Sequence, residues 1–135
     1  MGSPANGGPT RLRVFTARAR LSSFGYAARG VRELVGREHN AWIHLAATLA
    51  VAAAGLILRL DASDWRWLIL AAALVWCAEA INTAVEGLCD HVHPGFDAVI
   101  GRVKDIAAGA VLIAAIAAAL IGAITFLPHL LERCS

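Results

Sequence analysis

The chain has 135 residues, of which 59% are hydrophobic and 16% charged, with a formal net charge of +2 and a mean hydropathy of +0.64. Soluble domains are roughly 45–50% apolar and about one quarter charged, so this balance excludes an ordinary soluble domain and indicates lipid as the solvent. No segment alternates apolar and polar residues as a membrane β-barrel would. The composition therefore predicts an all-α integral membrane protein.

A polar leader and a basic segment come first in the chain. Residues 1–10 are rich in Gly, Pro, Ser and Asn, which predicts a disordered leader. Seven of the twelve basic residues lie between Arg11 and Arg37, interleaved with apolar side chains. This pattern predicts an amphipathic helix in the membrane interface, with nucleic-acid binding as the weaker alternative. We expect residues 11–135 to form a single membrane domain.

Three apolar stretches follow, and each is long enough to cross a hydrocarbon core that needs about 20 helical residues. They cover about residues 41–58, 65–88 and 106–131, and Pro128 interrupts only the end of the third. Because most of the basic residues precede the first stretch, the positive-inside rule places the N-terminus in the cytoplasm. Three spans then put the loop from Asp90 to Lys104 on the same side, where nucleotides are available.

The second stretch carries an acidic stripe, Glu79, Asn82, Glu86 and Asp90, within roughly 80° on one helix face. An ionised carboxylate within a bilayer costs roughly 2.5–3.5 kcal/mol on insertion scales, so the stripe needs a cation, a basic partner or water. The structural alternative is that Asn82 joins helices while Glu79 and Glu86 pair with Arg or Lys. We expect the stripe to serve chemistry instead.

Other polar residues of the apolar stretches gather at the same membrane face. Glu38 and Asn40 lie at the start of the first stretch, and Lys104 and Asp105 at the start of the third. Carboxylates without thiolates suit Mg²⁺, which takes one or two protein carboxylates together with substrate phosphates. A further carboxylate can act as a general base, and a lysine can neutralise a transferred phosphoryl group. No G-x-x-x-x-G-K-S/T motif is present, which excludes a P-loop nucleotide site.

A cluster of Cys89, His91 and His93 follows the stripe. The three side chains are close enough in sequence to bind a transition metal, but their spacing fits no standard zinc site. We therefore expect a solvated loop at this point.

Four blocks of residues resemble the prokaryotic diacylglycerol kinase family, which includes undecaprenol kinases. The resemblance covers about residues 20–126. The blocks are Ser23–Gly30, then Glu38-x-Asn40 with Ile43-His44, then Glu79-x-x-Asn82-Thr83-Ala84-x-Glu86-x-x-x-Asp90, and then Lys104-Asp105-x-Ala107-Ala108.

The resemblance implies a homotrimer of three-span subunits in the bacterial inner (plasma) membrane, with active sites shared between neighbouring subunits. It implies transfer of the γ-phosphoryl group of MgATP to the hydroxyl of a membrane lipid alcohol. Glu79 then resembles the general base, Asn82 a residue that shapes its site, and Glu38 and Glu86 the metal ligands. The implied nucleotide contacts are Tyr26, Asp90, Lys104, Asp105 and the loop residues Gly95, Phe96 and Asp97.

The substrate and the class of function leave alternatives open. Diacylglycerol is the leading substrate, and undecaprenol is nearly as well supported, since Glu38-x-Asn40 and Ile43-His44 lean toward that branch. A small ion or proton conductor also accommodates an acidic stripe in a span, but it has no need for Lys104-Asp105. A non-catalytic membrane subunit fits the nearly complete motif set less well.

Overall fold

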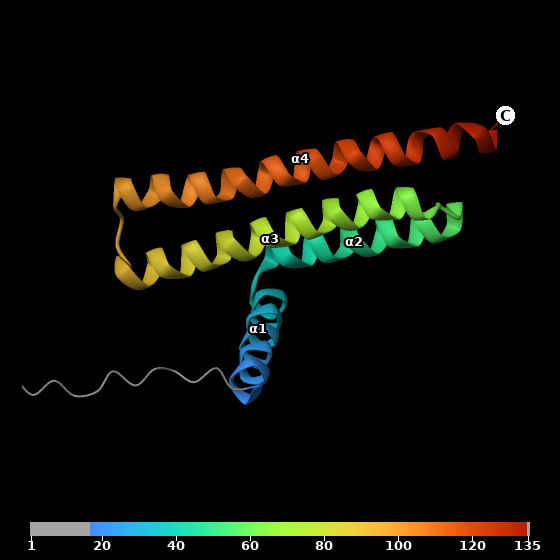
Figure 1. The fold of residues 1–135 in the computed structure, drawn as a ribbon. Helices are drawn as coiled ribbons and strands as arrows, with labels where there is room; N and C mark the ends of the chain where they lie inside the picture. The colour runs from blue at the N-terminus through green and yellow to red at the C-terminus, as the bar shows by residue number, and fades with distance from the viewer. Residues whose placement is uncertain (1–16, 135) are drawn as a thin grey trace, which may run out of the picture.

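The computed structural model describes residues 17–134, which form four helices (Figure 1). In chain order these are α1 (Ala17–Arg37), α2 (His39–Leu58), α3 (Ala62–Val92) and α4 (Ala98–Cys134). No strand occurs within that range, and the all-α prediction is confirmed. The leader expected over residues 1–10 lies outside the described residues.

The long helices α2, α3 and α4 run alongside one another, and α1 leaves them at a steep angle (Figure 1). α3 packs along α4 over most of its length and touches α2 over a shorter stretch. Each of these three helices is long and apolar enough to cross a membrane, and each contains one of the apolar stretches expected from the sequence. α3 and α4 also extend beyond those stretches at both ends.

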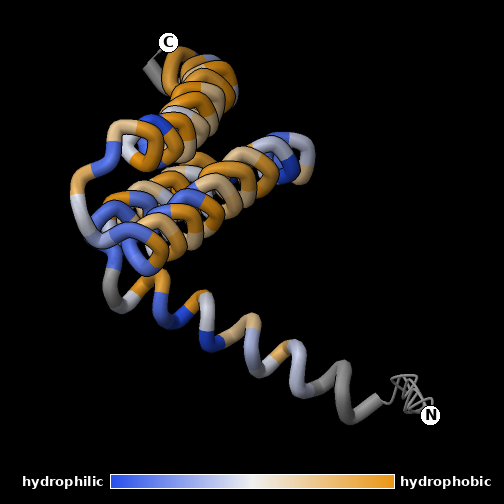
Figure 2. Tube along the Cα trace, turned by 90° about the vertical axis from the view of Figure 1, so that its left-hand side faces the viewer, coloured by the Kyte–Doolittle hydropathy of each residue, from blue (hydrophilic) through white to orange (hydrophobic). Residues whose placement is uncertain are grey.

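Apolar residues predominate along the three long helices, as the hydropathy colours of Figure 2 show, and many of their large side chains are exposed. Leu56, Ile69, Ile113 and Ile124 are each more than 60% exposed. Such a surface would be unfavourable in water, but hydrocarbon is as apolar as these side chains are. The distribution is that of helices surrounded by lipid.

α2 and α3 are joined by a tight turn that depends on a glycine. Gly55 is buried, and a Cβ at this position would lie 2.9 Å from Cζ2 of Trp65. Its carbonyl accepts the N–H of Leu60, while Arg59 adopts the left-handed conformation (φ 57°) that ends α2. The absence of a side chain on Gly55 therefore lets the start of α3 pack closely on the end of α2.

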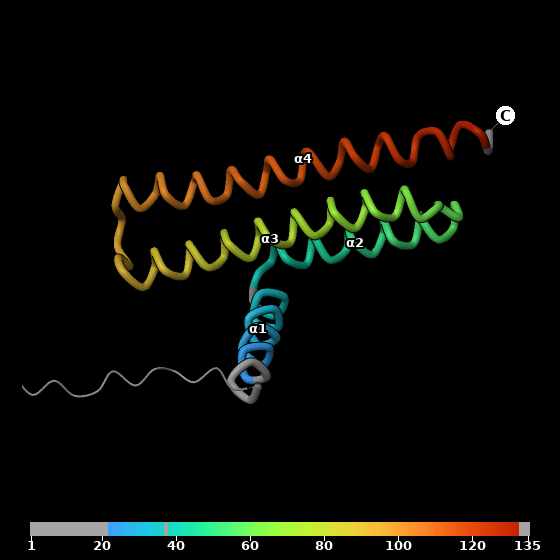
Figure 3. Tube along the Cα trace, viewed as in Figure 1, coloured from blue at the N-terminus to red at the C-terminus, as the bar shows by residue number. Residues whose placement is uncertain are grey.

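The connection between α3 and α4 is shorter than the loop from Asp90 to Lys104 expected from the sequence (Figure 3). α3 continues to Val92 and α4 begins at Ala98, which leaves residues 93–97 as the loop. Asp97 ends the loop, because its Oδ1 accepts the backbone N–H groups of Val99 (2.7 Å) and Ile100 (2.9 Å). Helix capping thus places Asp90 and Lys104 on facing helices.

Candidate active site

The buried face of α3 contains two residues of the acidic stripe. Glu79 is 1% exposed and Asn82 5%, whereas Asp90 is exposed. Their neighbours on this face are apolar, and the steps of three, four and seven residues between members keep them on one side of the helix. The buried residues of α3 are Leu68, Ala71, Val75, Glu79, Asn82 and Cys89. The stripe therefore starts in the protein interior and reaches solvent at its C-terminal end.

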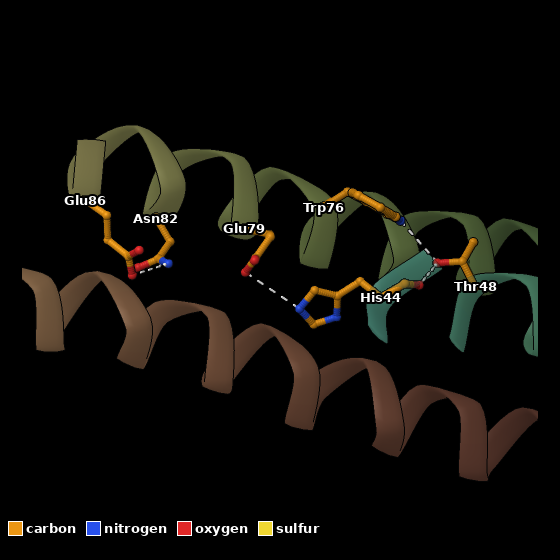
Figure 4. A network of polar contacts seen from close by, with 6 residues as sticks. All are labelled: His44, Thr48, Trp76, Glu79, Asn82 and Glu86. Carbon is orange, nitrogen blue, oxygen red and sulfur yellow. Dashed lines mark hydrogen bonds and ion pairs between the residues drawn. The ribbon is translucent and has the colours of Figure 1, made fainter. Parts of the chain in front are cut away.

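The carboxylate of Glu79 lies between α2, α3 and α4 (Figure 4). Its Oε2 is 3.7 Å from Nε2 of His44 on α2, and the two side chains are 2% and 17% exposed. This Oε2 is buried and has no hydrogen-bond partner among the described residues. An unsatisfied carboxylate oxygen in the interior is costly, which is typical of a group kept for chemistry.

Asn82 bonds within its own helix rather than across to another one. Its Nδ2 donates to Oε1 of Glu86 at 2.9 Å, as Figure 4 shows. Its Oδ1 is buried without a partner in the described part of the chain. The bond orients the carboxylate of Glu86, and a hydrogen bond from Asn82 to another helix, which the structural alternative required, is absent among residues 17–134.

The two expected metal ligands line one cleft between α1 and α3. The cleft has a volume of about 490 Å³ and also reaches Asp90 and Glu33. Its walls are otherwise small or apolar. The lining consists of Gly30, Val31, Glu33, Leu34, Glu38, Ala80, Thr83, Ala84, Glu86, Gly87 and Asp90.

The cleft suits a cation that is shared with a substrate. Across residues 17–134 no three His, Cys, Asp or Glu side chains lie close enough to hold a metal ion by themselves. Mg²⁺ does not need such a set, because one or two carboxylates and the phosphates of a substrate complete its coordination. Glu38 and Glu86 have the oxygen chemistry that this arrangement uses.

Lys104 of α4 lies against the exposed end of the stripe. Its Nζ is 2.8 Å from Oδ1 of Asp90, and the two side chains are 34% and 65% exposed. The next residue, Asp105, is exposed. A lysine is thereby fixed near the cleft that contains Asp90.

The structure does not bring the remaining predicted nucleotide contacts into the cleft lining. Tyr26 lies on α1, one turn before the first cleft residue of that helix, and the Arg29 guanidinium carbon lies 4.6 Å from its ring centroid. Phe96 in the loop is 97% exposed, and Gly95 beside it is also exposed. The backbone N–H groups of Ile100 and Val99 lower the pKa of Asp97 below its usual 3.8. The carboxylate of Asp97 is therefore engaged in capping α4.

The Cys89, His91 and His93 cluster does not lie in a loop as expected. Cys89 is buried within α3, and His91 lies in the last turn of that helix. Only His93 follows the helix, because the α-helical hydrogen bonds continue as far as the N–H of His93, which bonds to the carbonyl of Cys89 at 2.9 Å. Because residues two positions apart on a helix do not face each other, His91 points away from Cys89, and no metal-binding group of three side chains is found among the described residues.

Two residues at the site had received less weight from the sequence. His44 entered only as part of a block of the resemblance, and Glu33 was given no role, yet the first faces Glu79 and the second lines the cleft. The signal for His44 was its place in a block of the resemblance. Glu33 carried none, because its position depends on the angle at which α1 meets α3.

Comparisons with known proteins show sequence relatives that match most of the chain. Residues 25–126 match the family described as prokaryotic diacylglycerol kinase. The undecaprenol kinase of Bacillus subtilis (strain 168) is 34% identical over 110 residues, which cover 82% of this chain and 89% of that protein. The diacylglycerol kinase of Escherichia coli (strain K12) is 33% identical over 116 residues, covering 81% of this chain and 89% of that protein.

A further relative is longer than this chain. The diacylglycerol kinase of Synechocystis sp. is 40% identical over 113 residues, which cover 83% of this chain but 65% of that protein. The matched region includes α2, α3 and the cleft residues that they contribute. On this coverage and identity, the chain belongs to the prokaryotic diacylglycerol kinase family.

Proposed function

We propose that the chain transfers the γ-phosphoryl group of MgATP to the hydroxyl of a membrane lipid alcohol, with diacylglycerol as the leading substrate and phosphatidic acid as its product. Family membership identifies it as a lipid kinase. The observation that carries the proposed mechanism is the buried carboxylate of Glu79, whose Oε2 has no partner among the described residues; the same helix contributes Glu86 to a cleft that Glu38 also lines. Phosphoryl transfer requires positioning and charge neutralisation, and these residues offer both.

Glu79 is the proposed general base. Its buried carboxylate makes no hydrogen bond through Oε2 among the described residues, so it can accept the proton of a lipid hydroxyl as the hydroxyl oxygen bonds to the γ-phosphorus. Asn82 shapes the site, since its side chain lies on the same buried face and holds Glu86 at 2.9 Å. Residues 79–86 of α3 thus carry both the proposed base, Glu79, and a proposed metal ligand, Glu86.

Glu38 and Glu86 are the proposed ligands of Mg²⁺. Both line the cleft, and bound Mg²⁺ would neutralise charge on the phosphates of ATP. Lys104, Asp90 and Asp105 are the proposed nucleotide contacts at the mouth of the site, with Lys104 near the phosphates. Tyr26 and the loop residues Gly95, Phe96 and Asp97 complete the proposal, and the exposure of Tyr26, Gly95 and Phe96 leaves these three accessible to a nucleotide.

The hydrocarbon chain of the lipid has a matching groove. A groove of about 350 Å³ begins at His44 and runs between α2, α3 and α4 as far as Phe126. Apart from His44 and Thr48, its lining consists of Ala, Gly, Val, Leu and Phe. Because the polar end of this groove lies beside Glu79, a lipid chain in it would direct its hydroxyl toward the base.

Undecaprenol is the second candidate substrate. The relative from Bacillus subtilis is named an undecaprenol kinase, and this chain spans 89% of its length. A polyprenol and a diacylglycerol both present a primary hydroxyl, and the apolar groove accepts either kind of chain on chemical grounds. A phosphorylation assay with each alcohol distinguishes the two substrates.

We also propose a homotrimer with shared active sites in the bacterial inner (plasma) membrane, with the N-terminus in the cytoplasm. The excess of basic residues before α2 supports this orientation. The cleft supports a shared site, because its carboxylates form no set of three metal-binding side chains among residues 17–134 of one subunit.

The decisive experiment is a phosphorylation assay of the purified protein in mixed micelles. Diacylglycerol and undecaprenol are supplied side by side with ATP, with and without Mg²⁺. We expect phosphorylated lipid only when Mg²⁺ and a lipid alcohol are both present, and Glu79→Gln should abolish it with the fold intact. Retained activity in Glu79→Gln would remove the base assignment, whereas ion flux in liposomes without ATP would favour a conductor.

A further inference from the structure

His44 faces Glu79 from the neighbouring helix and has no role in the function proposed above. Its Nε2 is the atom that approaches the carboxylate, 3.7 Å from Oε2. That oxygen is buried and lacks a hydrogen-bond partner among residues 17–134. In an interior of low dielectric constant a polar group without a partner is strongly unfavourable, so a donor this close is a candidate partner.

The ring of His44 is held in place from α3, the helix that also carries Glu79. Trp76 packs edge-on against it, with ring centroids 6.4 Å apart and an interplanar angle of 67°. Nε1 of Trp76 donates to Oγ1 of Thr48 at 3.1 Å, and that hydroxyl donates to the carbonyl of His44 at 2.7 Å (Figure 4). The ring is therefore fixed on one side by Trp76 while its Nε2 points to Glu79.

His44 also lies between the apolar groove and the carboxylate of Glu79. The residue lines the apolar groove at the end beside Glu79, and its Nε2 lies within ion-pair distance of that carboxylate. A lipid alcohol whose chain occupies the groove would pass His44 before its hydroxyl reached the carboxylate. The histidine is thus placed to control which oxygen of Glu79 the hydroxyl meets.

We propose that His44 is a positioning residue for Glu79, donating the hydrogen on Nε2 to Oε2 and thereby presenting Oε1 to the lipid hydroxyl. This inference rests on the proposed function. The present distance shortens to that of a hydrogen bond if the side chains move by roughly 0.5–1 Å, and catalytic hydrogen bonds commonly tighten when substrate binds.

His44 neither gains nor loses a proton in the proposed phosphoryl transfer. The hydroxyl proton moves to Oε1 of Glu79 as the lipid oxygen bonds to the γ-phosphorus. The bond between that phosphorus and the bridging oxygen of ATP breaks, and ADP leaves with the electron pair. His44 keeps its hydrogen on Nε2 throughout, which distinguishes it from a second base.

The test compares His44→Ala with His44→Gln, because glutamine keeps an amide donor at similar reach. We expect kcat of His44→Ala to fall about 10- to 100-fold, as for other groups that orient a reacting side chain, with KM for MgATP within about twofold. His44→Gln should keep most of the activity. Added imidazole should restore part of the activity of His44→Ala, since removal of the ring leaves space beside the groove. His91→Ala, an exposed histidine on α3, is the matched control and should behave as wild type.

Wild-type kcat in His44→Ala overturns the proposal, and so does an equal loss in both variants without rescue by imidazole. A second measurement needs neither kinase activity nor the alanine variant. The ¹⁵N chemical shifts of the labelled His44 ring report which nitrogen carries hydrogen, and a ring protonated at Nδ1 alone contradicts the proposal. If the wild type phosphorylates no lipid alcohol, the proposed function fails, while these shifts still decide whether the pair exists.

Discussion

Nζ of Lys104 lies 2.8 Å from Oδ1 of Asp90, so that one ion pair joins α4 to α3 across the short loop of residues 93–97. The pair is partly exposed, which limits its contribution to stability because solvent screens it. The ion pair instead holds the ammonium group of Lys104 beside the cleft that Glu86 lines.

Replacing Lys104 by glutamine should therefore impair catalysis more than folding. We expect kcat/KM for MgATP to fall by roughly 10²–10³-fold, the range for removing one electrostatic donor from a transition state. The thermal unfolding midpoint should remain close to that of wild type. Arg66→Gln, which changes an exposed cation near the start of α3, is the control and should leave both quantities unchanged. A normal kcat/KM in Lys104→Gln would contradict a phosphate contact.

The bond from Asn82 to Glu86 predicts an altered requirement for Mg²⁺. Asn82→Leu keeps the approximate volume of the side chain but removes the 2.9 Å hydrogen bond that orients Glu86. We expect the half-saturating Mg²⁺ concentration to rise about 10- to 100-fold, as when a partner of a metal ligand is lost. Titration of activity with free Mg²⁺ measures this.

Thr125→Val is a suitable comparison, because Thr125 is also a buried polar residue but lies on α4 away from the cleft lining. Its Mg²⁺ dependence should be that of wild type. If the two variants shift the Mg²⁺ dependence equally, the effect is a general loss of packing and Asn82 does not orient a metal ligand.

Much of the fold was predictable because lipid imposes simple rules. Backbone groups in hydrocarbon must be satisfied within a helix, so apolar stretches of sufficient length specified α2, α3 and α4. The acidic stripe was equally predictable, since the 3.6-residue period of a helix places Glu79 and Asn82 on one face. The apolar stretches and the helical period are local properties of the sequence. Glu79 and Asn82 lie on one face of α3, as expected, and the structure shows that this face is buried.

What the sequence could not supply was the distance between helices. The contact of His44 with Glu79 depends on how α2 packs against α3, and the cleft depends on the angle of α1. The boundary of the loop was also missed, because α3 continues past Asp90 to Val92 and capping by Asp97 starts α4 at Ala98, despite the polarity of that segment. Polar composition near a span end does not distinguish a helix end from a loop.

The close approach at Gly55 makes a prediction about stability. A methyl group there would meet Cζ2 of Trp65 at 2.9 Å and Cδ1 of Leu60 at 3.3 Å, so side chains or helices must shift. We expect Gly55→Ala to lower the free energy of unfolding by about 1–3 kcal/mol, the usual range for overpacking. Gly101→Ala is the control, since a Cβ there meets nothing within 4 Å and alanine favours the helix. Unfolding in mixed micelles measures both, and equal stability of the two variants would show that the turn adapts freely.

The cap at the start of α4 predicts a local dependence on pH. The N–H groups of Ile100 and Val99 lower the pKa of Asp97 below its usual 3.8, so the ionised cap stabilises the helix at neutral pH. Because the pKa is lowered in the folded state, this stabilisation is complete above about pH 4 and is lost as the pH falls through the folded pKa. Hydrogen exchange should show protection of these two amides falling in acid, and Asp97→Ala should lack that protection at every pH. The amides of Ser63 and Asp64, capped in the same way by Asp61, should keep their protection in Asp97→Ala, since the two caps lie on different helices. A loss of protection at both caps in this variant would mean that the helix ends open together and that Asp97 does not act locally.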